Sequence, residues 1–169
     1  MPYTILEKRD GYELRRYSEC VIATVHINAN LVDAANIGFG PLVRYISGGN
    51  LGGERMAMTA PVLQAESEKH GYDVSFVLPA SVDVLNIPVP DDSRISTKVL
   101  PQRTMAVHRY RGRWTSKSFT IATQNLKAQL ERDKIAVSGP AQWARFDPPW
   151  TPPFLRTNEV LIPVNFSEG

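Results

Sequence analysis

Residues 48–62 read GGNLGGERMAMTAPV and place four glycines between a helical pattern and a strand pattern. Glycine tolerates positive φ angles, so these residues predict a chain that leaves a helix and enters a strand within a few positions. From Glu54 onward the segment is predicted to be extended and to pair as a hairpin with residues 73–79, DVSFVLP, across a polar loop. Met56 and Met58 would then point to the same side, because side chains alternate along a strand.

The residues before this segment predict a buried strand and one amphipathic helix. Residues 20–27, CVIATVHI, are rich in β-branched side chains, which are typical of a core strand. Apolar residues then recur at steps of three and four, which is the spacing of one helical face. These residues are Val32, Ala35, Phe39, Leu42, Val43 and Ile46.

The sequence GFGP at 38–41 interrupts the helical pattern. An interior glycine costs about 1 kcal/mol and an interior proline about 3 kcal/mol, so the segment predicts a bend or a restart of the helix. Two interpretations stay open. Either the helix begins at Gly40 or Pro41, or the glycines bare one flank so that a flat ligand can approach the backbone.

The second half of the chain repeats this order. After a connector at about 80–97, residues 103–110 predict a strand, and residues 116–132 predict a helix with Ser116 or Ser118 as its N-cap. The buried face of that helix is predicted to hold Phe119, Ala122, Leu126 and Leu130. Each half then has a short strand ending at proline, a loop and another strand: AMTAPV with DVSFVLP, and ARFDPP with NEVLIPV.

Residues 3–8 and 12–17 flank Asp10-Gly11 and predict a further hairpin near the N-terminus. The whole pattern predicts an α+β fold. Two repeated β-α-β-β units, at about 3–79 and 97–166, would form a curved antiparallel sheet or distorted β-barrel flanked by two helices. With 169 residues, of which 43% are hydrophobic, the chain is expected to form a single domain over residues 1–169.

Composition narrows the classes of function. The one cysteine, Cys20, has no intrachain disulfide partner, and no export signal or membrane-spanning stretch is visible, so a cytoplasmic protein is expected. Basic and aromatic residues alternate in HRYRGRW, 108–114, as in some nucleic-acid surfaces. The net charge is only +2, so we interpret this run as a strand with one solvated side and expect no nucleic-acid partner.

Five motifs together resemble the SOUL haem-binding protein family, in the family's order and over nearly the whole chain. They are YELRRY, LVRYISGGN, ERMAMTAPV, VSFVLP and DPPWTPPFLRTNEVLIPV. The resemblance implies a distorted barrel or open sheet of two repeated units with two helices. It also implies non-catalytic binding of haem, a metal-free porphyrin or a related tetrapyrrole in the cytoplasm, for haem buffering or trafficking.

The resemblance further implies an apolar groove between the first helix and the late loop, which we define as residues 147–156. The helix would contribute Phe39, Val43 and Arg44, and the late loop Trp150, Phe154 and Arg156. A porphyrin is an apolar plate with two anionic propionates, so the apolar side chains would cover the plate and the arginines would meet the propionates. Met56 and Met58 would fill either an adaptable wall of this groove or the protein core.

No metal ligand is assigned. Some family members have a histidine where this chain has Arg16, and a protonated guanidinium donates no lone pair to iron. The remaining His and Cys residues lack the paired spacing of a metal site. They are His26, His70, His108 and Cys20.

An alternative function comes from a second resemblance. The expected fold is similar to that of GyrI-like small-molecule-binding domains, some of which are hydrolases acting on reactive compounds. Such chemistry requires a carboxylate or tyrosine in an apolar pocket, and the candidate groups are Glu54, Glu159, Tyr45 and Tyr110. No nucleophile elbow or phosphate-binding loop is present in the sequence, so no catalytic residue is assigned.

Overall fold

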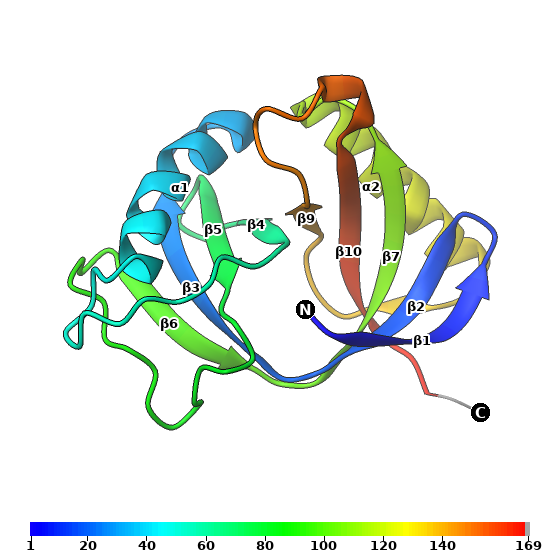
Figure 1. The fold of residues 1–169 in the computed structure, drawn as a ribbon. Helices are drawn as coiled ribbons and strands as arrows, with labels where there is room; N and C mark the ends of the chain where they lie inside the picture. The colour runs from blue at the N-terminus through cyan, green and yellow to red at the C-terminus, as the bar shows by residue number, and fades with distance from the viewer. Residues whose placement is uncertain (168–169) are drawn as a thin grey trace. The chain divides into compact units, whose positions relative to one another are not determined.

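The computed structural model describes residues 1–167. The chain divides into two compact units. Unit 2 is the continuous segment Glu19–Pro101, and unit 1 combines Met1–Ser18 with the chain from Gln102 onward. Each unit consists of antiparallel strands and one long helix that lies on one face of them (Figure 1). The predicted α+β fold is therefore confirmed.

Unit 2 contains four strands and helix α1. The strands pair in the order β4-β5-β3-β6, and β5 lies between β4 and β3, with Phe76 opposite Val62 on one side and opposite Ala23 on the other. The elements are β3 (Cys20–Ile27), α1 (Leu31–Ile46), β4 (Val62–Glu66), β5 (Tyr72–Val77) and β6 (Ile95–Leu100).

Unit 1 pairs its strands in the order β1-β2-β7-β10-β9, while β8 pairs with the end of β10. A short 3-10 helix, η1, lies in the late loop. The elements are β1 (Tyr3–Arg9), β2 (Tyr12–Tyr17), β7 (Arg103–Arg111), α2 (Ser116–Arg132), β8 (Ala136–Val137), β9 (Gln142–Arg145), η1 (Pro153–Leu155) and β10 (Thr157–Asn165).

The duplication predicted from the order of elements is present. In β3-α1-β4-β5 and in β7-α2-β9-β10, the last strand pairs with both the first and the second strand of its repeat. The additional strand is β6 beside β3 in one unit and β2 beside β7 in the other. The hairpin β1–β2, which precedes the first repeat in the sequence, belongs to unit 1.

The strand predicted over ERMAMTAPV is wrong in position. Residues 56–60 are not in a strand, and β5 pairs instead with Val62–Glu66, part of which was predicted to be a loop. Pro61 lacks the N–H that a continuing ladder requires. The polar residue Gln64 is accommodated because its side chain is buried and its Nε2 donates to the carbonyl oxygen of Leu31. Strand β6 also begins at Ile95, inside the predicted connector.

The predicted restart of the first helix at Gly40 or Pro41 is also wrong, because α1 continues through both residues. Asn30 caps it, and its Oδ1 accepts hydrogen bonds from the N–H groups of Val32 and Asp33 at 3.1 and 3.0 Å. Packing explains why residue 38 is a glycine, because a Cβ there would lie 3.0 Å from Val74 Cβ. The helix therefore packs more closely on β5 than an alanine would allow.

Helix α2 agrees with its predicted span, but its N-cap is Thr115 rather than Ser116 or Ser118. Thr115 Oγ1 accepts from the N–H of Ser118 at 3.1 Å. The predicted apolar face packs against β2, β7 and β10. The buried core of unit 1 is Tyr12, Leu14, Ala106, Ala122, Leu126, Leu130, Val160, Ile162 and Val164, with Phe119 partly buried against it.

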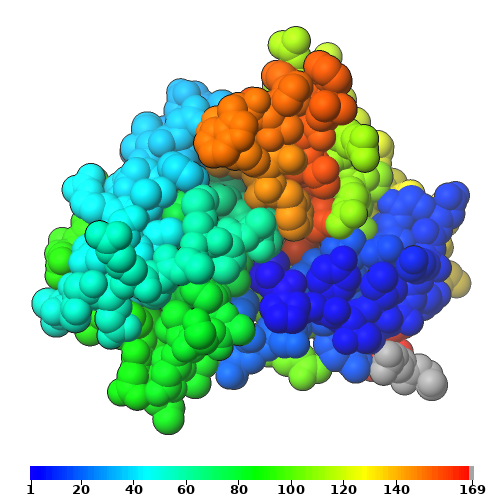
Figure 2. Space-filling view, in the orientation of Figure 1, coloured from blue at the N-terminus to red at the C-terminus, as the bar shows by residue number. Residues whose placement is uncertain are grey.

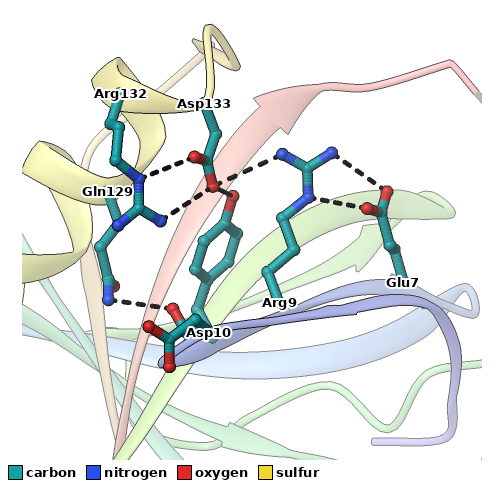
Figure 3. A network of polar contacts seen from close by, with 7 residues as sticks. Glu7, Arg9, Asp10, Gln129, Arg132 and Asp133 are labelled. Atoms are coloured by element: carbon teal, nitrogen blue, oxygen red, sulfur yellow. Dashed lines mark hydrogen bonds and ion pairs between the residues drawn. The ribbon is translucent and has the colours of Figure 1, made fainter.

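The C-terminal end of α2 is tied to the β1–β2 hairpin by a network of polar contacts (Figure 3). The carboxylate of Asp133 accepts from Tyr12 OH at 2.7 Å and from Arg132 Nε at 2.9 Å, and it lies 3.4 Å from Arg9 Nη1. Gln129 Nε2 donates to the carbonyl oxygen of Asp10 at 3.1 Å. The hydrogen bond from Arg132, followed by that from Tyr12, holds the pKa of Asp133 well below its ordinary value.

We expect the two glycines of α1 to respond differently to alanine. Gly40→Ala should change the free energy of unfolding by less than about 1 kcal/mol, because no atom beyond its chain neighbours and the helix backbone lies within 4 Å of the new methyl group and alanine favours the helix, while the same methyl group crowds the ring of Pro41. Gly38→Ala should lower it, because crowding of Val74 and Val25 costs about 1–3 kcal/mol. Urea unfolding followed by circular dichroism measures both, and equal stabilisation by the two variants would contradict the packing described for Gly38.

We expect Asp133→Asn to destabilise the protein in a pH-dependent way. A carboxyl with a lowered folded-state pKa contributes stability above its unfolded-state pKa of about 4 and loses that contribution as the pH falls. The difference in melting temperature between wild type and variant should be full above about pH 5 and shrink towards pH 2. Tyr12→Phe removes one donor and should give a smaller effect of the same form, whereas a constant difference across this pH range would contradict the assignment.

Candidate functional site

The candidate residues of α1 lie at the margin of the unit 2 core. Phe39 and Val43 are half-buried against this core, and the Phe39 ring packs edge-to-face on Phe76 with 5.4 Å between centroids. Arg44, in the last turn of the helix, is exposed. The backbone therefore presents two apolar side chains and one cation from consecutive turns of the same helix.

The two candidate methionines have different environments. Met56 is half-buried against the same core as Phe39 and Val43, and its N–H donates to the carbonyl oxygen of Ile46 at 2.8 Å. Met58 is 53% exposed. The structure thus brings Met56 together with the helical candidates as a packing residue, and leaves the Met58 thioether largely in solvent.

The glycine-rich turn that precedes these methionines is organised by Asn50. The buried Asn50 side chain donates to the carbonyl oxygens of Tyr45 and Glu54 at 3.2 and 2.8 Å, and it accepts from the N–H of Glu54 at 2.9 Å. Gly48 has a φ of 113°, and a Cβ on Gly49 would lie only 2.7 Å from the carbonyl oxygen of Arg44. The glycines are therefore required by the turn itself.

The late loop exposes its aromatic side chains. Trp150 is 83% exposed, Phe154 is 72% exposed and the adjacent Leu155 is 48% exposed. Figure 2 shows this loop, in orange, at the surface of unit 1. Exposed apolar side chains of this size, adjacent in one loop, are typical of a surface that contacts another molecule.

The third candidate of the late loop, Arg156, holds the loop in shape. Its Nε donates to the carbonyl oxygen of Thr151 at 3.0 Å, and its Nη2 donates to that of Pro149 at 2.6 Å. Its Cζ lies 4.0 Å from the centroid of the Trp114 ring. These acceptors are neutral, so the positive charge of Arg156 is fixed in place without being compensated by them.

Sequence reasoning missed a second arginine at the same tryptophan. Arg145 is only 7% exposed, and its Cζ lies 4.7 Å from the centroid of the Trp114 ring and 5.2 Å from that of Trp143. Burial, followed by repulsion from Arg156, lowers the pKa of Arg145 to about 10. The signal available in the sequence was the spacing in WARF, since Trp143 and Arg145 are two apart on a strand and share a face.

The candidate acid Glu159 belongs to a buried ion-pair network. Arg15 Nη1 lies 3.0 Å from Glu159 Oε1, and Arg109 Nη2 lies 2.8 Å from the same oxygen. The Arg15 and Glu159 side chains are 4% and 1% exposed, and Arg15 Nη1 also donates to Tyr17 OH. Two guanidinium groups neutralise this carboxylate, so the geometry gives it a structural role across β2, β7 and β10.

The other groups considered for acid–base chemistry are divided between the two units. Tyr45 OH donates to the carbonyl oxygen of Pro88 at 2.7 Å, and Glu54 is exposed. Burial raises the pKa of Tyr110 well above its ordinary value, so this hydroxyl stays protonated at neutral pH. Tyr45 and Glu54 belong to unit 2, whereas Tyr110 and Glu159 belong to unit 1.

A cavity of about 320 Å³ lies in unit 1 beside the β1–β2 hairpin. Residues of β1, β2 and β7 line it, among them Tyr3, Lys8, Arg15 and Arg109. The lining includes none of the late-loop candidates. This cavity is not an apolar site, because charged side chains line it. Two of them, Arg15 and Arg109, are already paired with Glu159.

His26 and His108 have hydrogen-bonding partners within the protein, and His70 is exposed. His26 Nδ1 lies 3.0 Å from Asp73 Oδ1, His108 Nδ1 lies 2.6 Å from the carbonyl oxygen of Gly11, and His70 is exposed in a turn. Within residues 1–167, no group of three or more His, Cys, Asp or Glu side chains is placed to hold a metal ion. In the same residues, no helix has both the length and the apolar character needed to cross a membrane.

Solved structures share this fold. The crystal structure of the EcmrR C-terminal domain matches with a TM-score of 0.70 at 16% identity, covering 98% of this chain and 99% of that one. A hydrolase from Listeria innocua matches with a TM-score of 0.60 at 10% identity, covering 95% and 94%. SAV2435 bound to tetraphenylphosphonium matches with a TM-score of 0.51 at 11% identity, covering 91% and 93%. At these identities the likeness is one of fold alone.

Sequence comparison is more specific than the fold. No curated protein matches the chain. The model of the SOUL heme-binding protein family matches residues 1–163, which is nearly its whole length and agrees with the motifs quoted above. The chain therefore belongs to the SOUL haem-binding protein family.

Proposed function

We propose that this protein binds haem or a related tetrapyrrole without catalysis, for buffering or trafficking in the cytoplasm. Membership of the SOUL family over residues 1–163 is the observation that carries the proposal. The exposed aromatic side chains of the late loop support it, because a porphyrin plate gains most where it covers apolar surface that water would otherwise contact.

The proposal involves two sets of contact residues, one in each unit. Trp150 and Phe154 of the late loop are exposed and apolar, which suits them to cover part of a flat macrocycle. In unit 2, Phe39 and Val43 keep part of their surface open beside Gly40, where no atom lies within 4 Å of the position of a Cβ. The interpretation that this glycine bares the helix for a ligand is therefore retained as part of the proposal.

The remaining candidates have secondary roles in the proposal. Arg44 is exposed and would meet a propionate, whereas Arg156 would act through its charge, because its hydrogen bonds to carbonyl oxygens hold it in the loop. Met58 would be an adaptable contact, and Met56 would support the helix from the core. No axial ligand is proposed, so the apolar plate and not the iron would supply most of the affinity.

The alternative of a GyrI-like small-molecule site is supported by one observation: SAV2435, a protein of the same fold, was solved bound to tetraphenylphosphonium. Such an aromatic cation is held by a carboxylate together with aromatic faces. In this chain the aromatic faces are exposed in the late loop, but the buried carboxylate Glu159 is already paired with Arg15 and Arg109. We therefore rank an anionic or neutral flat ligand above a cation. A nucleic-acid partner is not part of the proposal.

We expect haemin and metal-free protoporphyrin IX to bind with similar affinity, within about three-fold, because the proposal places no ligand on the iron. Titrations followed at the Soret band measure both. The double variant Trp150→Ala/Phe154→Ala should weaken both by about ten-fold or more, since each ring loses roughly 1 kcal/mol or more of contact. Leu85→Ala removes an 86% exposed apolar side chain elsewhere and should have no effect.

Three results of these titrations would count against the proposal or part of it. Binding of haemin alone would mean that an iron ligand is present. Binding of neither tetrapyrrole, together with saturable binding of tetraphenylphosphonium, would favour the alternative. An equal loss of affinity in the Leu85 variant would show that the contacts are not specific to the late loop.

We expect Arg44→Glu to weaken haemin binding more than Arg111→Glu. Both side chains are exposed, so the comparison controls for the change in net charge. Only Arg44 lies beside the proposed contacts of α1, where a reversed charge would repel a propionate. Raising the salt concentration should reduce the difference between the variants. Equal affinities of the two variants would remove Arg44 from the site.

A further inference from the structure

The guanidinium of Arg145 is buried without an acidic partner. The residue is 7% exposed, and its guanidinium lies against the indole rings of Trp114 and Trp143, with no side-chain hydrogen bond or ion pair to any residue in the described part of the chain. Buried charges are ordinarily paired, because desolvation of an unpaired charge is costly. Its pKa of about 10 still leaves the group protonated at neutral pH.

The surroundings of Arg145 add positive charge. Arg156 contacts the same Trp114 ring, with its Cζ 4.0 Å from the centroid, and its own hydrogen bonds go to neutral carbonyl oxygens. Thr115, the N-cap of α2, directly follows Trp114, and the first turn of that helix holds no acidic residue. The helix dipole therefore adds a partial positive charge instead of compensating one.

The nearby carboxylates are committed elsewhere. Asp147, two residues beyond Arg145, accepts a hydrogen bond from the backbone N–H of Thr157. Glu159, on the paired strand β10, is bound by Arg15 and Arg109. Two arginines thus share one indole ring without a counter-ion from the described residues.

A second observation concerns an unused donor. The indole Nε1 of Trp114 is buried and has no hydrogen-bond partner among residues 1–167. An unsatisfied buried donor costs about 1–3 kcal/mol, so native proteins usually supply an acceptor. The unpaired guanidinium calls for an acceptor that carries negative charge, and the indole N–H calls for a hydrogen-bond acceptor.

We propose that the Arg145–Trp114–Arg156 cluster of unit 1 binds the carboxylate group of a small organic anion. A carboxylate is planar and accepts two hydrogen bonds from one guanidinium. The two indole rings and the exposed aromatic side chains of the late loop make the surroundings apolar, which favours a singly charged organic anion over strongly hydrated phosphate. A free carboxylic acid and the propionate of a tetrapyrrole are two sources of this chemistry.

Benzoate is the first probe, and isothermal titration with the full chain is the measurement. We expect saturable binding that is about ten-fold or more weaker in Arg145→Gln, because a charge-assisted hydrogen bond contributes about 1.5–3 kcal/mol. Arg109→Gln is the matched control, since it removes an arginine of the same unit that is already paired, and benzoate affinity should be unchanged. Methyl benzoate, which has the same ring without the charge, should not bind.

An NMR measurement keeps the test independent of whether the Arg145 variant folds. In wild-type protein, benzoate should shift the Nε1–H resonance of Trp114, assigned with Trp114→Phe, more than that of Trp143, whose Nε1 already donates to Asn158. A shift for Trp143 alone would overturn the proposal.

Two further comparisons distinguish a tetrapyrrole propionate from a free carboxylic acid as the ligand of this site. Protoporphyrin IX that binds more tightly than its dimethyl ester, with the difference abolished in Arg145→Gln, would support the site with a propionate as its occupant, even if benzoate fails. Benzoate binding without tetrapyrrole binding would support the site while removing the haem proposal. Tighter binding of inorganic phosphate than of benzoate, equal binding of methyl benzoate, or no Arg145-dependent binding of any carboxylate would overturn it.

Discussion

The last strand of each repeat, β5 or β10, is hydrogen-bonded on both edges by strands of the same repeat, and this pairing decides which side chains reach the helix. Strand β10 lies between β7 and β9 as β5 lies between β3 and β4. Because neighbouring residues of a strand face opposite ways, Val160 packs in the core beneath α2 while Glu159 meets Arg15 on the other face. A slip of one residue would move the Glu159 carboxylate to the core face and bring Asn158 or Val160 to its position among the arginines, so the register and the ion pairs specify each other.

Most of the candidate residues lie in or beside the turn and the loop that connect the paired strands and helices, where strand pairing does not decide which way a side chain points. The glycine-rich turn follows α1 and is held by the side chain of Asn50, and the late loop precedes β10 and is held by Arg156. Each segment fastens its backbone with internal hydrogen bonds and leaves apolar side chains outside the core, Met58 in one case and Trp150 and Phe154 in the other. A rigid frame with uncovered aromatic rings limits the entropy lost when a ligand is bound.

The sequence predicted those parts of the structure that local pattern controls. The face of α2 and the β-α-β-β order follow from periodicity, and the family follows from motifs over residues 1–163. Long-range packing decided the rest: Gly38 keeps α1 continuous against Val74, and the buried Gln64 lies in a strand because the carbonyl oxygen of Leu31 is within its reach. The sequence did not predict Arg145 as a site residue, because a buried charge can be recognised as unpaired only when the positions of the surrounding carboxylates are known.

The order of the chain within unit 1 has a consequence for biosynthesis. The hairpin β1–β2 leaves the ribosome before unit 2, and its partners β7 and α2 follow only after all of unit 2. Unit 2 is continuous and has its complete core as soon as β6 emerges, whereas the hairpin stays unpaired along one edge until β7 has been synthesised. Nascent chains halted once residue 101 has left the ribosome would therefore carry a folded unit 2 and a strand hairpin that is open to chaperones.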